Sequence, residues 1–259
     1  MAEVPDTWNP AQYEKFRAER AAPFFDLLAL VRRRAGMRVV DLGCGTGELT
    51  HQLHRELQAR ETLGVDRSEA MLAKTAAFAG DGLRFEQGDI ASFTANPAFD
   101  LIFSNAAIQW VPEHELLLGR LAASLADGGQ LAVQVPANHD HPSHTIAAAV
   151  AGEPPFREAL GGYVRHSPVL AVEQYAAVLH RIGFEVQHAR LQVYGHLLPS
   201  RDEVVEWVKG TLLTDYEARM PADLFQTFLV RFRERLLPCL DDAKPYFYPF
   251  KRILFWAQR

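Results

Sequence analysis

The chain has 259 residues, 48% of them hydrophobic and 23% charged, which fits one large globular domain with a substantial core. Its net charge of −5 gives no general attraction to phosphate backbones, so we do not expect nucleic acid as a partner. The lack of a long apolar run or a signal peptide, with only two cysteines far apart, predicts a cytoplasmic protein without a disulfide or a membrane partner, and we expect a monomer.

Apolar side chains recur at helical spacing from residue 10 to residue 34, which predicts a helix that ends at Arg34-Ala35-Gly36. Strand-like and helix-like runs then alternate, which predicts a parallel sheet with helices on both faces. The predicted strands are Arg38–Leu42, Thr62–Asp66, Leu83–Glu86, Asp100–Ser104 and Gln130–Val135, and the predicted helices are Gly47–Gln58, Ser68–Ala79 and His114–Ala126. Ser68 is suited to cap its helix, and Asp127-Gly128-Gly129 predicts a turn before the fifth strand.

The alternation stops after Pro136. Residues 137–170 look like a loop region with some helix, and a helix over Ala171–Ile182 and a strand over Phe184–Leu198 follow. Residues 200–243 predict two or three amphipathic helices, and RILFWAQ predicts a last strand. A helical segment is therefore expected between the final two strands, where it could cap the ends of the sheet.

The stretch VVDLGCGTGELT, residues 39–50, joins the first strand to its helix through Gly43, Gly45 and Gly47. In an open parallel sheet, ligands bind outside the carboxyl ends of the strands, and a glycine lets a ligand approach the backbone closely. The spacing differs from the dinucleotide fingerprint and lacks the lysine of a P-loop. Asp41, just before the turn, is poorly placed to face a pyrophosphate and well placed to meet an ammonium group or a water shell.

Two further acids follow strands. Asp66 ends the second strand, where a carboxylate can accept two hydrogen bonds from a ribose diol. Asp89 follows the third strand and can accept from an exocyclic amine, with Ile90 packing on a base. Together with the glycine turn, these acids point to a nucleoside-containing ligand.

At these residues the sequence resembles the class I S-adenosylmethionine-dependent methyltransferases, through VVDLGCGTGELT, GVDRSEAML, QGDI and FDLIFSNAAIQWV. The resemblance covers about residues 37–135. It implies a Rossmann-like α/β fold, with a seven-stranded, mostly parallel sheet whose antiparallel last strand lies between strands five and six. It also implies S-adenosylmethionine as the cofactor, its methionine part over Gly43–Gly47, its ribose at Asp66 and its adenine by Asp89 and Ile90. The expected cofactor-binding residues are Trp8, Tyr13, Asp41, Gly43, Gly45, Gly47, Asp66, Arg67, Asp89, Ile90 and Asn105.

A narrower resemblance, to methyltransferases that esterify trans-aconitate, spans nearly the whole chain. The segments that carry it are WNPAQYEKFRAER, SNAAIQWVPEH, LAVQVPANHDHPSH, YGHLLPSRDEVVEWVKGT and FKRILFWAQR. It implies methyl transfer to a carboxylate of that acid, by orientation and desolvation and without a catalytic side chain. We expect one methyltransferase domain over 1–259, with an N-terminal helical lid at 8–34, a cofactor-binding core at 37–135 and substrate-side insertions at 136–170 and 195–249.

A small acidic substrate needs cationic and hydrogen-bonding partners. The candidates are Arg20, Gln109, Trp110, Tyr163, His166 and Arg252. Each also has an ordinary interpretation: Arg20, Arg252 and the loop carrying Tyr163 and His166 could lie on the surface, and Trp110 could simply pack. The run NHDHPSH has too few ligands at suitable spacing, so we expect no metal site.

Other functions remain open. The substrate could be another acidic metabolite or a malonyl-carrier protein, and the latter would favour a basic patch. The chain could also bind the cofactor without catalysis. An RNA methyltransferase is disfavoured by the acidic balance and by the lack of a recognisable RNA-binding module.

Overall fold

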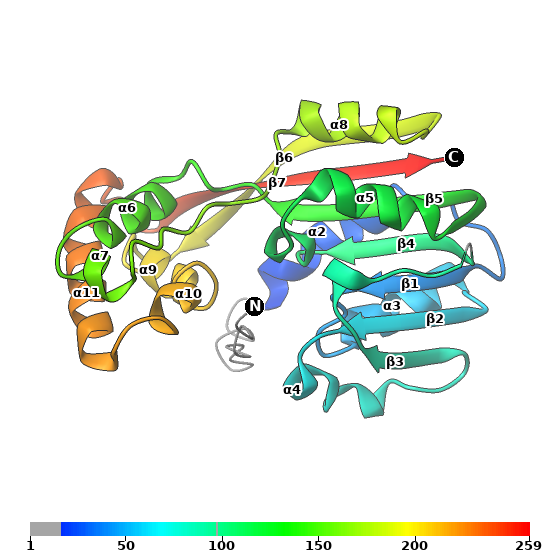
Figure 1. The fold of residues 1–259 in the computed structure, drawn as a ribbon, viewed down its shortest axis with the longest axis horizontal. Coiled ribbons are helices and arrows are strands. Elements are labelled where there is room, and N and C mark those ends of the chain that lie inside the picture. Colours follow the sequence, from blue (N-terminus) through cyan, green and yellow to red (C-terminus); the bar gives the residue numbers. More distant parts are fainter. Residues whose placement is uncertain (1–16, 97) are drawn as a thin grey trace. The chain divides into compact units, whose positions relative to one another are not determined.

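The computed structural model describes residues 17–96 and 98–259, with side chains described from residue 21 onward (Figure 1). Two of the expected cofactor-binding residues, Trp8 and Tyr13, lie outside the described residues. The chain divides into two compact units. The sheet unit holds residues 17–136, 168–192 and 252–259, and the helical unit holds 137–167 and 193–251.

A seven-stranded sheet has the order β3-β2-β1-β4-β5-β7-β6. Its strands are β1 (Arg38–Leu42), β2 (Glu61–Asp66), β3 (Leu83–Gln87), β4 (Phe99–Asn105), β5 (Leu125–Pro136), β6 (Val186–Leu198) and β7 (Tyr246–Gln258). The first five strands pair in parallel, and β7 runs antiparallel to β5, between β5 and β6. The expected fold class is confirmed, and the strand order reverses between β1 and β4, where such sheets bind ligands.

The helices fall into two groups. In the sheet unit they are α2 (Arg17–Leu28), α3 (Glu48–Leu57), α4 (Glu69–Leu72), α5 (His114–Ala123) and α8 (Val172–Arg181), with short 3₁₀ turns η1 (Thr75–Ala77), η2 (Ile90–Ser92) and η3 (Ile108–Trp110). In the helical unit they are α6 (Pro142–Ala151), α7 (Phe156–Ala159), α9 (Glu203–Lys209), α10 (Thr214–Glu217) and α11 (Ala222–Leu236), with η4 (Leu237–Cys239). None of these helices is both long and apolar enough to cross a membrane.

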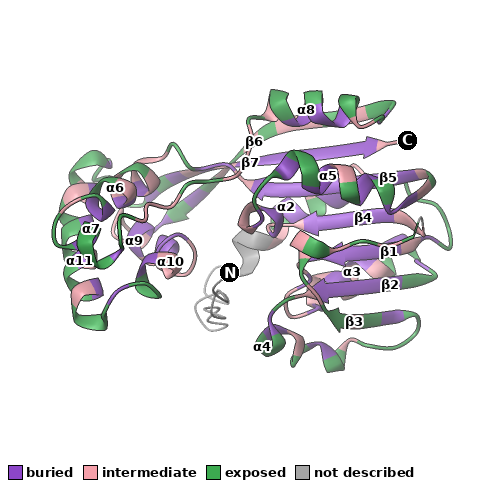
Figure 2. Ribbon diagram, viewed as in Figure 1, coloured by how far each residue is buried: buried purple, intermediate pink, exposed green. Residues whose placement is uncertain are grey.

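Both faces of the sheet are covered, and the central strands are therefore buried on both sides (Figure 2). On one face, Phe24 of α2 packs edge-on against Phe103 of β4, with ring centroids 5.1 Å apart. On the other, Tyr175 of α8 stacks on Phe255 of β7 at 4.7 Å. The alternation of strand-like and helix-like runs predicted helices on both faces.

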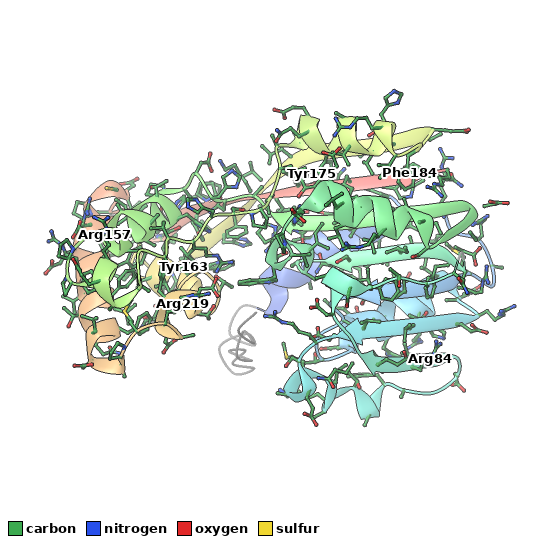
Figure 3. All side chains as sticks on the ribbon, in the orientation of Figure 1. Arg84, Arg157, Tyr163, Tyr175, Phe184 and Arg219 are labelled. Carbon is green, nitrogen blue, oxygen red and sulfur yellow. The ribbon has the colours of Figure 1, made fainter. Side chains whose placement is uncertain are left out.

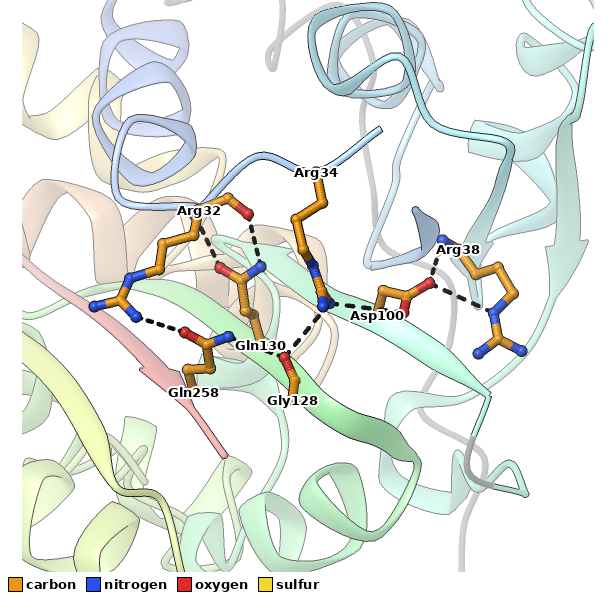
Figure 4. Close-up of polar contacts among 7 residues, drawn as sticks. All are labelled: Arg32, Arg34, Arg38, Asp100, Gly128, Gln130 and Gln258. Atoms are coloured by element: carbon orange, nitrogen blue, oxygen red, sulfur yellow. Dashed lines mark hydrogen bonds and ion pairs between the residues drawn. The ribbon is translucent and has the colours of Figure 1, made fainter. Parts of the chain in front are cut away.

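The first helix ends earlier than its apolar spacing predicts. After Leu28 the chain turns, and the backbone N–H and C=O of Arg32 bond the side chain of Gln130 on β5, each at 2.8 Å (Figure 4). Two nearby arginines, Arg34 and Arg38, pair with Asp100 at 3.7 and 3.5 Å. These contacts attach the segment to the sheet, which helix periodicity alone could not reveal.

Two further predicted helices are shorter in the structure. The helix expected over Ser68–Ala79 is α4 followed by η1, because the Thr75 hydroxyl bonds the carbonyl of Leu72 at 2.8 Å and competes with the helical pattern. Ser68 does cap α4, accepting from the backbone N–H of Met71 at 3.2 Å. The helix expected to run to Ala126 ends at Ala123, because β5 begins two residues later.

The strand β5 begins before the predicted turn. Leu125 pairs with Phe99 and Gln130 pairs with Leu101, so the four residues between them form an irregularity within the strand. Gly128 takes the left-handed conformation there, with φ of 67°, as a turn requires. The last strand also starts earlier than the predicted RILFWAQ, at Tyr246.

The helical unit has its own aromatic core. Phe228 of α11 lies 5.3 Å from the rings of both Phe156 and Tyr216. Its neighbours on the helix, Phe225 and Phe232, are also buried, which fits the amphipathic helices predicted for residues 200–243.

Candidate active site

The glycine turn after β1 is hydrogen-bonded to the end of β2. The carbonyl of Val65 accepts from the N–H groups of Gly43 and Cys44 at 2.8 and 3.1 Å. The Asp66 carboxylate accepts from the N–H of Gly45 at 2.8 Å through one oxygen and from the N–H of Ser68 at 2.9 Å through the other. These bonds place the turn against the carboxyl end of β2.

The three glycines serve different purposes. A Cβ on Gly43 would lie 2.1 Å from Cβ of Ala107, and one on Gly47 would lie 2.8 Å from the ring of Phe85, so neighbouring protein side chains fill both spaces. Only at Gly45 does a Cβ meet nothing within 4 Å. Neighbouring side chains therefore explain why Gly43 and Gly47 lack a side chain, and Gly45 alone of the three has open space at its Cβ position. That all three glycines bind a ligand stays a prediction.

Asp66 is half-buried, and each of its oxygens keeps a lone pair after accepting a backbone N–H. A ligand hydroxyl could use that remaining capacity. Arg67, the next residue, is exposed.

Asp41 is buried at the end of β1, with 4% of its surface exposed. Burial raises the pKa of this carboxyl to about 7, and the nearby Asp66 charge adds to the shift. The Thr50 hydroxyl donates a hydrogen bond to the carboxylate at 2.6 Å and opposes the shift. A cation bound nearby would favour the ionised form. Thr50 is a partner that sequence patterns did not identify.

Asp89 and Ile90 follow β3 at the same end of the sheet. Asp89 is exposed and caps η2 by accepting from the N–H of Ala91 at 2.8 Å. Ile90 lies beside the turn, with its Cδ1 3.6 Å from the Cβ position of Gly43. The structure thus brings Ile90 next to the turn and leaves Asp89 accessible.

Unsatisfied acceptors lie at the end of β4 and in η3. The side-chain oxygens of Asn105 and Gln109 are buried and have no hydrogen-bond partner among the described residues. Gln109 donates to the carbonyl of Ala106 at 2.7 Å, and Ala106 has a positive φ of 55°, which is uncommon for alanine. Trp110 is half-buried in η3. Buried acceptors without donors are costly, so these two oxygens suit a ligand that donates.

Arg252 is also buried, with 4% exposed, so the surface alternative considered for it is wrong. It donates to the side-chain oxygen of Gln134 on β5 at 3.4 Å. Gln134 is a residue that the sequence reasoning missed, although a polar residue inside the apolar run LAVQVP was an available signal.

The remaining candidates are Arg20, Tyr163 and His166. Arg20 lies in α2, and its side chain is outside the described part of the structure. In the helical unit, Tyr163 is half-buried and carries the guanidinium of Arg219 4.0 Å above its ring (Figure 3). His166 is exposed.

The histidine-rich segment before α6 is structural. His141 caps α6 by accepting from the N–H of Ser143 at 3.1 Å, and the Ser143 hydroxyl also contacts His144 at 3.2 Å. Burial, helped by the Arg165 charge, lowers the pKa of His144 to about 3, so its ring is neutral. Within the described ranges, no group of three or more His, Cys, Asp or Glu side chains could hold a metal ion.

The residues around the turn fit S-adenosylmethionine. Gly45 faces open space, Asp66 can accept from hydroxyls, and Asn105 offers an unsatisfied oxygen to an ammonium group. Asp41 adds a carboxyl that a cation would ionise. An acceptor-rich site suits a ligand that carries an ammonium, a sulfonium and a ribose.

Comparison with known proteins agrees with this fit. A family model described as "Methyltransferase domain" matches residues 33–155. The YcgJ protein of Bacillus subtilis has a TM-score of 0.60 at 18% identity, covering 92% of this chain and 98% of its own. A methyltransferase of Geobacter sulfurreducens, solved with S-adenosyl-L-homocysteine, has a TM-score of 0.54 at 18% identity, covering 100% and 94%. The fold and the site define an S-adenosylmethionine-dependent methyltransferase of class I.

Sequence relatives narrow this class. A Deinococcus radiodurans protein named trans-aconitate 2-methyltransferase is 46% identical over 98% of both chains. Proteins of the same name from Methylobacterium nodulans and Variovorax paradoxus are 41% and 40% identical, over 97% and 95% of this chain and 98% and 94% of theirs. The chain belongs to the trans-aconitate 2-methyltransferase family.

Proposed function

We propose that this enzyme transfers a methyl group to one carboxylate of trans-aconitate, or of a closely related tricarboxylate, and forms a monomethyl ester. The observation that carries the proposal is the 46% identity, over 98% of both chains, to the Deinococcus radiodurans protein of that name. The accompanying product is S-adenosylhomocysteine.

The reaction needs no general base, because a carboxylate with a pKa of about 4 is already ionised at neutral pH. When bound, S-adenosylmethionine supplies a methyl group on a sulfonium, which leaves as a neutral thioether. A bond forms between the carboxylate oxygen and the methyl carbon, the carbon–sulfur bond breaks with its electron pair going to sulfur, and no proton moves. The protein's part is to orient the carboxylate and exclude water.

We assign cofactor binding to the residues around the glycine turn. Gly45 gives the ligand access to the backbone, and Asp66 accepts from the ribose hydroxyls. The Asn105 oxygen and the Asp41 carboxyl receive the ammonium group, and Ile90 packs against the adenine. The remaining candidates are assigned by resemblance alone: Trp8, Tyr13, Gly43, Gly47, Arg67 and Asp89.

We assign substrate binding to Gln109, Trp110 and Arg252, while Tyr163 and His166 are kept as substrate-binding candidates on sequence grounds alone. Arg20 and the rest of residues 8–34 are proposed as a lid, residues 37–135 as the cofactor-binding core, and 136–170 and 195–249 as substrate-side insertions. We also propose that the enzyme acts as a monomer in the cytoplasm. Its two cysteines support a reducing location, since Cys44 and Cys239 are both free.

Release of S-adenosylhomocysteine from labelled cofactor tests the substrate. Trans-aconitate, cis-aconitate, isocitrate, citrate and a malonyl-carrier protein are offered one at a time. Preferential turnover of trans-aconitate is the expected result. Preferential turnover of another acid would change the proposed substrate but leave carboxyl methylation as the proposed reaction. Cofactor binding without turnover of any acid would contradict the proposal.

A further inference from the structure

Gln134 is a fully buried polar residue, and only one of its two polar side-chain atoms has a hydrogen-bond partner among the described residues. Its side-chain oxygen accepts from Arg252 at 3.4 Å, while its side-chain nitrogen is buried and has no hydrogen-bond partner in the described part of the chain. The orientation of the Gln134 amide follows from this contact. A guanidinium has only donors, so the amide oxygen must face Arg252, and the amide nitrogen is the atom without a partner. A buried donor of this kind is costly unless something accepts from it.

The sheet register places three polar side chains on one face. Gln134 pairs with Asn105 of β4, and Arg252 pairs with Pro136, two residues beyond Gln134. Paired residues point to the same face of a sheet, as do residues two apart along a strand. This is the face of Phe103, which packs on α2.

The polar atoms on this face divide into acceptors and donors. Asn105, the last residue of β4, carries a buried side-chain oxygen without a hydrogen-bond partner among the described residues. The paired strands β5 and β7 carry the Gln134 amide N–H group and the buried Arg252 guanidinium. The acceptor part suits an ammonium group. The donor part suits an anion with two or more acceptor oxygens, and a carboxylate accepts from a guanidinium and an amide together.

We propose that Gln134 and Arg252 form a carboxylate-binding subsite, in which Gln134 both donates to the carboxylate and positions the guanidinium. The inference rests on the proposed function and deepens it. The carboxylate has two possible sources, which are a non-reacting carboxylate of the acid substrate and the amino-acid carboxylate of the cofactor.

Binding measurements on two variants separate these sources. Gln134→Glu keeps an oxygen for Arg252 but replaces the N–H donor with a repelling oxygen, and Gln134→Met removes both polar atoms at similar volume. Calorimetry gives the affinity for S-adenosylhomocysteine, and then the affinity of the loaded protein for trans-aconitate. The matched control is Gln130→Met, because Gln130 is equally buried on the same strand face but bonds Arg32 and Trp256 of the protein itself.

We expect Gln134→Glu to weaken one of the two affinities by about tenfold or more, as loss of a hydrogen bond to a charged group implies. Weaker trans-aconitate binding alone assigns the subsite to the substrate, and weaker S-adenosylhomocysteine binding assigns it to the cofactor. Both affinities unchanged in the folded Gln134→Glu and Gln134→Met proteins, or an equal loss in Gln130→Met, would overturn the proposal. Turnover of trans-aconitate by the wild type is measured separately. Lack of turnover there would contradict the proposed function, whereas the variants test only the subsite.

Discussion

The carboxylate of Asp66 accepts a hydrogen bond from the backbone N–H of Gly45 at 2.8 Å, and so joins the end of β2 to the turn after β1. Its other oxygen accepts from Ser68, which caps the next helix. One side chain therefore holds the open glycine and retains capacity for a ligand hydroxyl. We therefore expect Asp66 to act on the site both through contact with the ligand and through the shape of the turn.

Replacing Asp66 should weaken cofactor binding. Asp66→Ala removes a charged acceptor and leaves the Gly45 N–H without its partner, so we expect S-adenosylhomocysteine binding to weaken by about 1–3 kcal/mol in calorimetry. Glu61→Ala is the control, because Glu61 is exposed at the opposite end of β2. Equal affinities of the Asp66→Ala and wild-type proteins would remove Asp66 from the site.

Alanine at Gly43 and alanine at Gly45 should have different effects. At Gly43 the new methyl group would overlap Ala107, so we expect a loss of folding stability of roughly 2–4 kcal/mol or failure to fold. At Gly45 there is space, and the left-handed φ of 56° adds only about 1 kcal/mol of strain.

Urea unfolding and cofactor binding distinguish the two variants. Gly45→Ala should remain folded and bind S-adenosylhomocysteine less well, because its methyl group occupies the open space. A Gly43→Ala protein as stable as Gly45→Ala would show that Ala107 can move aside.

Asp41 should make the unliganded protein less stable as pH rises. Its folded pKa of about 7 lies above the ordinary 3.8, so its stabilising contribution is complete below pH 4 and is lost as pH rises through 7. The difference between the two pKa values corresponds to at most roughly 4 kcal/mol. Asp41→Asn removes this dependence and keeps an acceptor for Thr50.

The test compares the unfolding free energies of wild type and Asp41→Asn between pH 4 and pH 8, without cofactor. We expect the unfolding free energy of the variant to rise relative to that of the wild type as pH rises. If Asp41 receives the ammonium group, the variant should also bind S-adenosylhomocysteine less well. A constant difference across this range would show that Asp41 ionises normally in the folded protein.

A buried pair on the opposite face of the sheet should affect stability but not catalysis. The Tyr175 hydroxyl lies 2.5 Å from Nδ1 of His114, whose Nε2 lies 2.9 Å from the carbonyl of Ile108. Burial lowers the pKa of His114, so the neutral ring donates from Nε2 and accepts at Nδ1. Tyr175→Phe removes the donor and should destabilise the protein by about 1–3 kcal/mol in urea unfolding.

A double-mutant cycle with His114→Ala should then show coupling between the two changes. Additive effects would mean that the short contact contributes little. A changed KM for the acid in Tyr175→Phe would instead connect this pair to the site.

Much of the fold was predictable from local sequence. β1 was predicted with its observed bounds, since apolar runs alternating with amphipathic stretches determine a parallel sheet. The end of α2 was not predictable, because it depends on Gln130, 98 residues away. The start of β5 depends likewise on pairing with β4.

The candidate site, too, was only partly predictable from the sequence. The glycines, Asp41 and Asp66 stand in one recognisable pattern, so sequence located them. Other contacts could not be read from the sequence, because folding brings together residues that are distant in the chain. These are the packing of Ala107 and Phe85 against the glycines, the Thr50–Asp41 hydrogen bond and the Gln134–Arg252 pair.

The central claim is carboxyl methylation, and the fate of a labelled methyl group tests it most directly. The enzyme is given trans-aconitate and cofactor labelled in the methyl group, and the product is then treated with mild alkali. A monomethyl ester predicts that the label enters the acid fraction and is released as methanol by alkali. Label that stays in the acid fraction after alkali, or never enters it, would contradict the account.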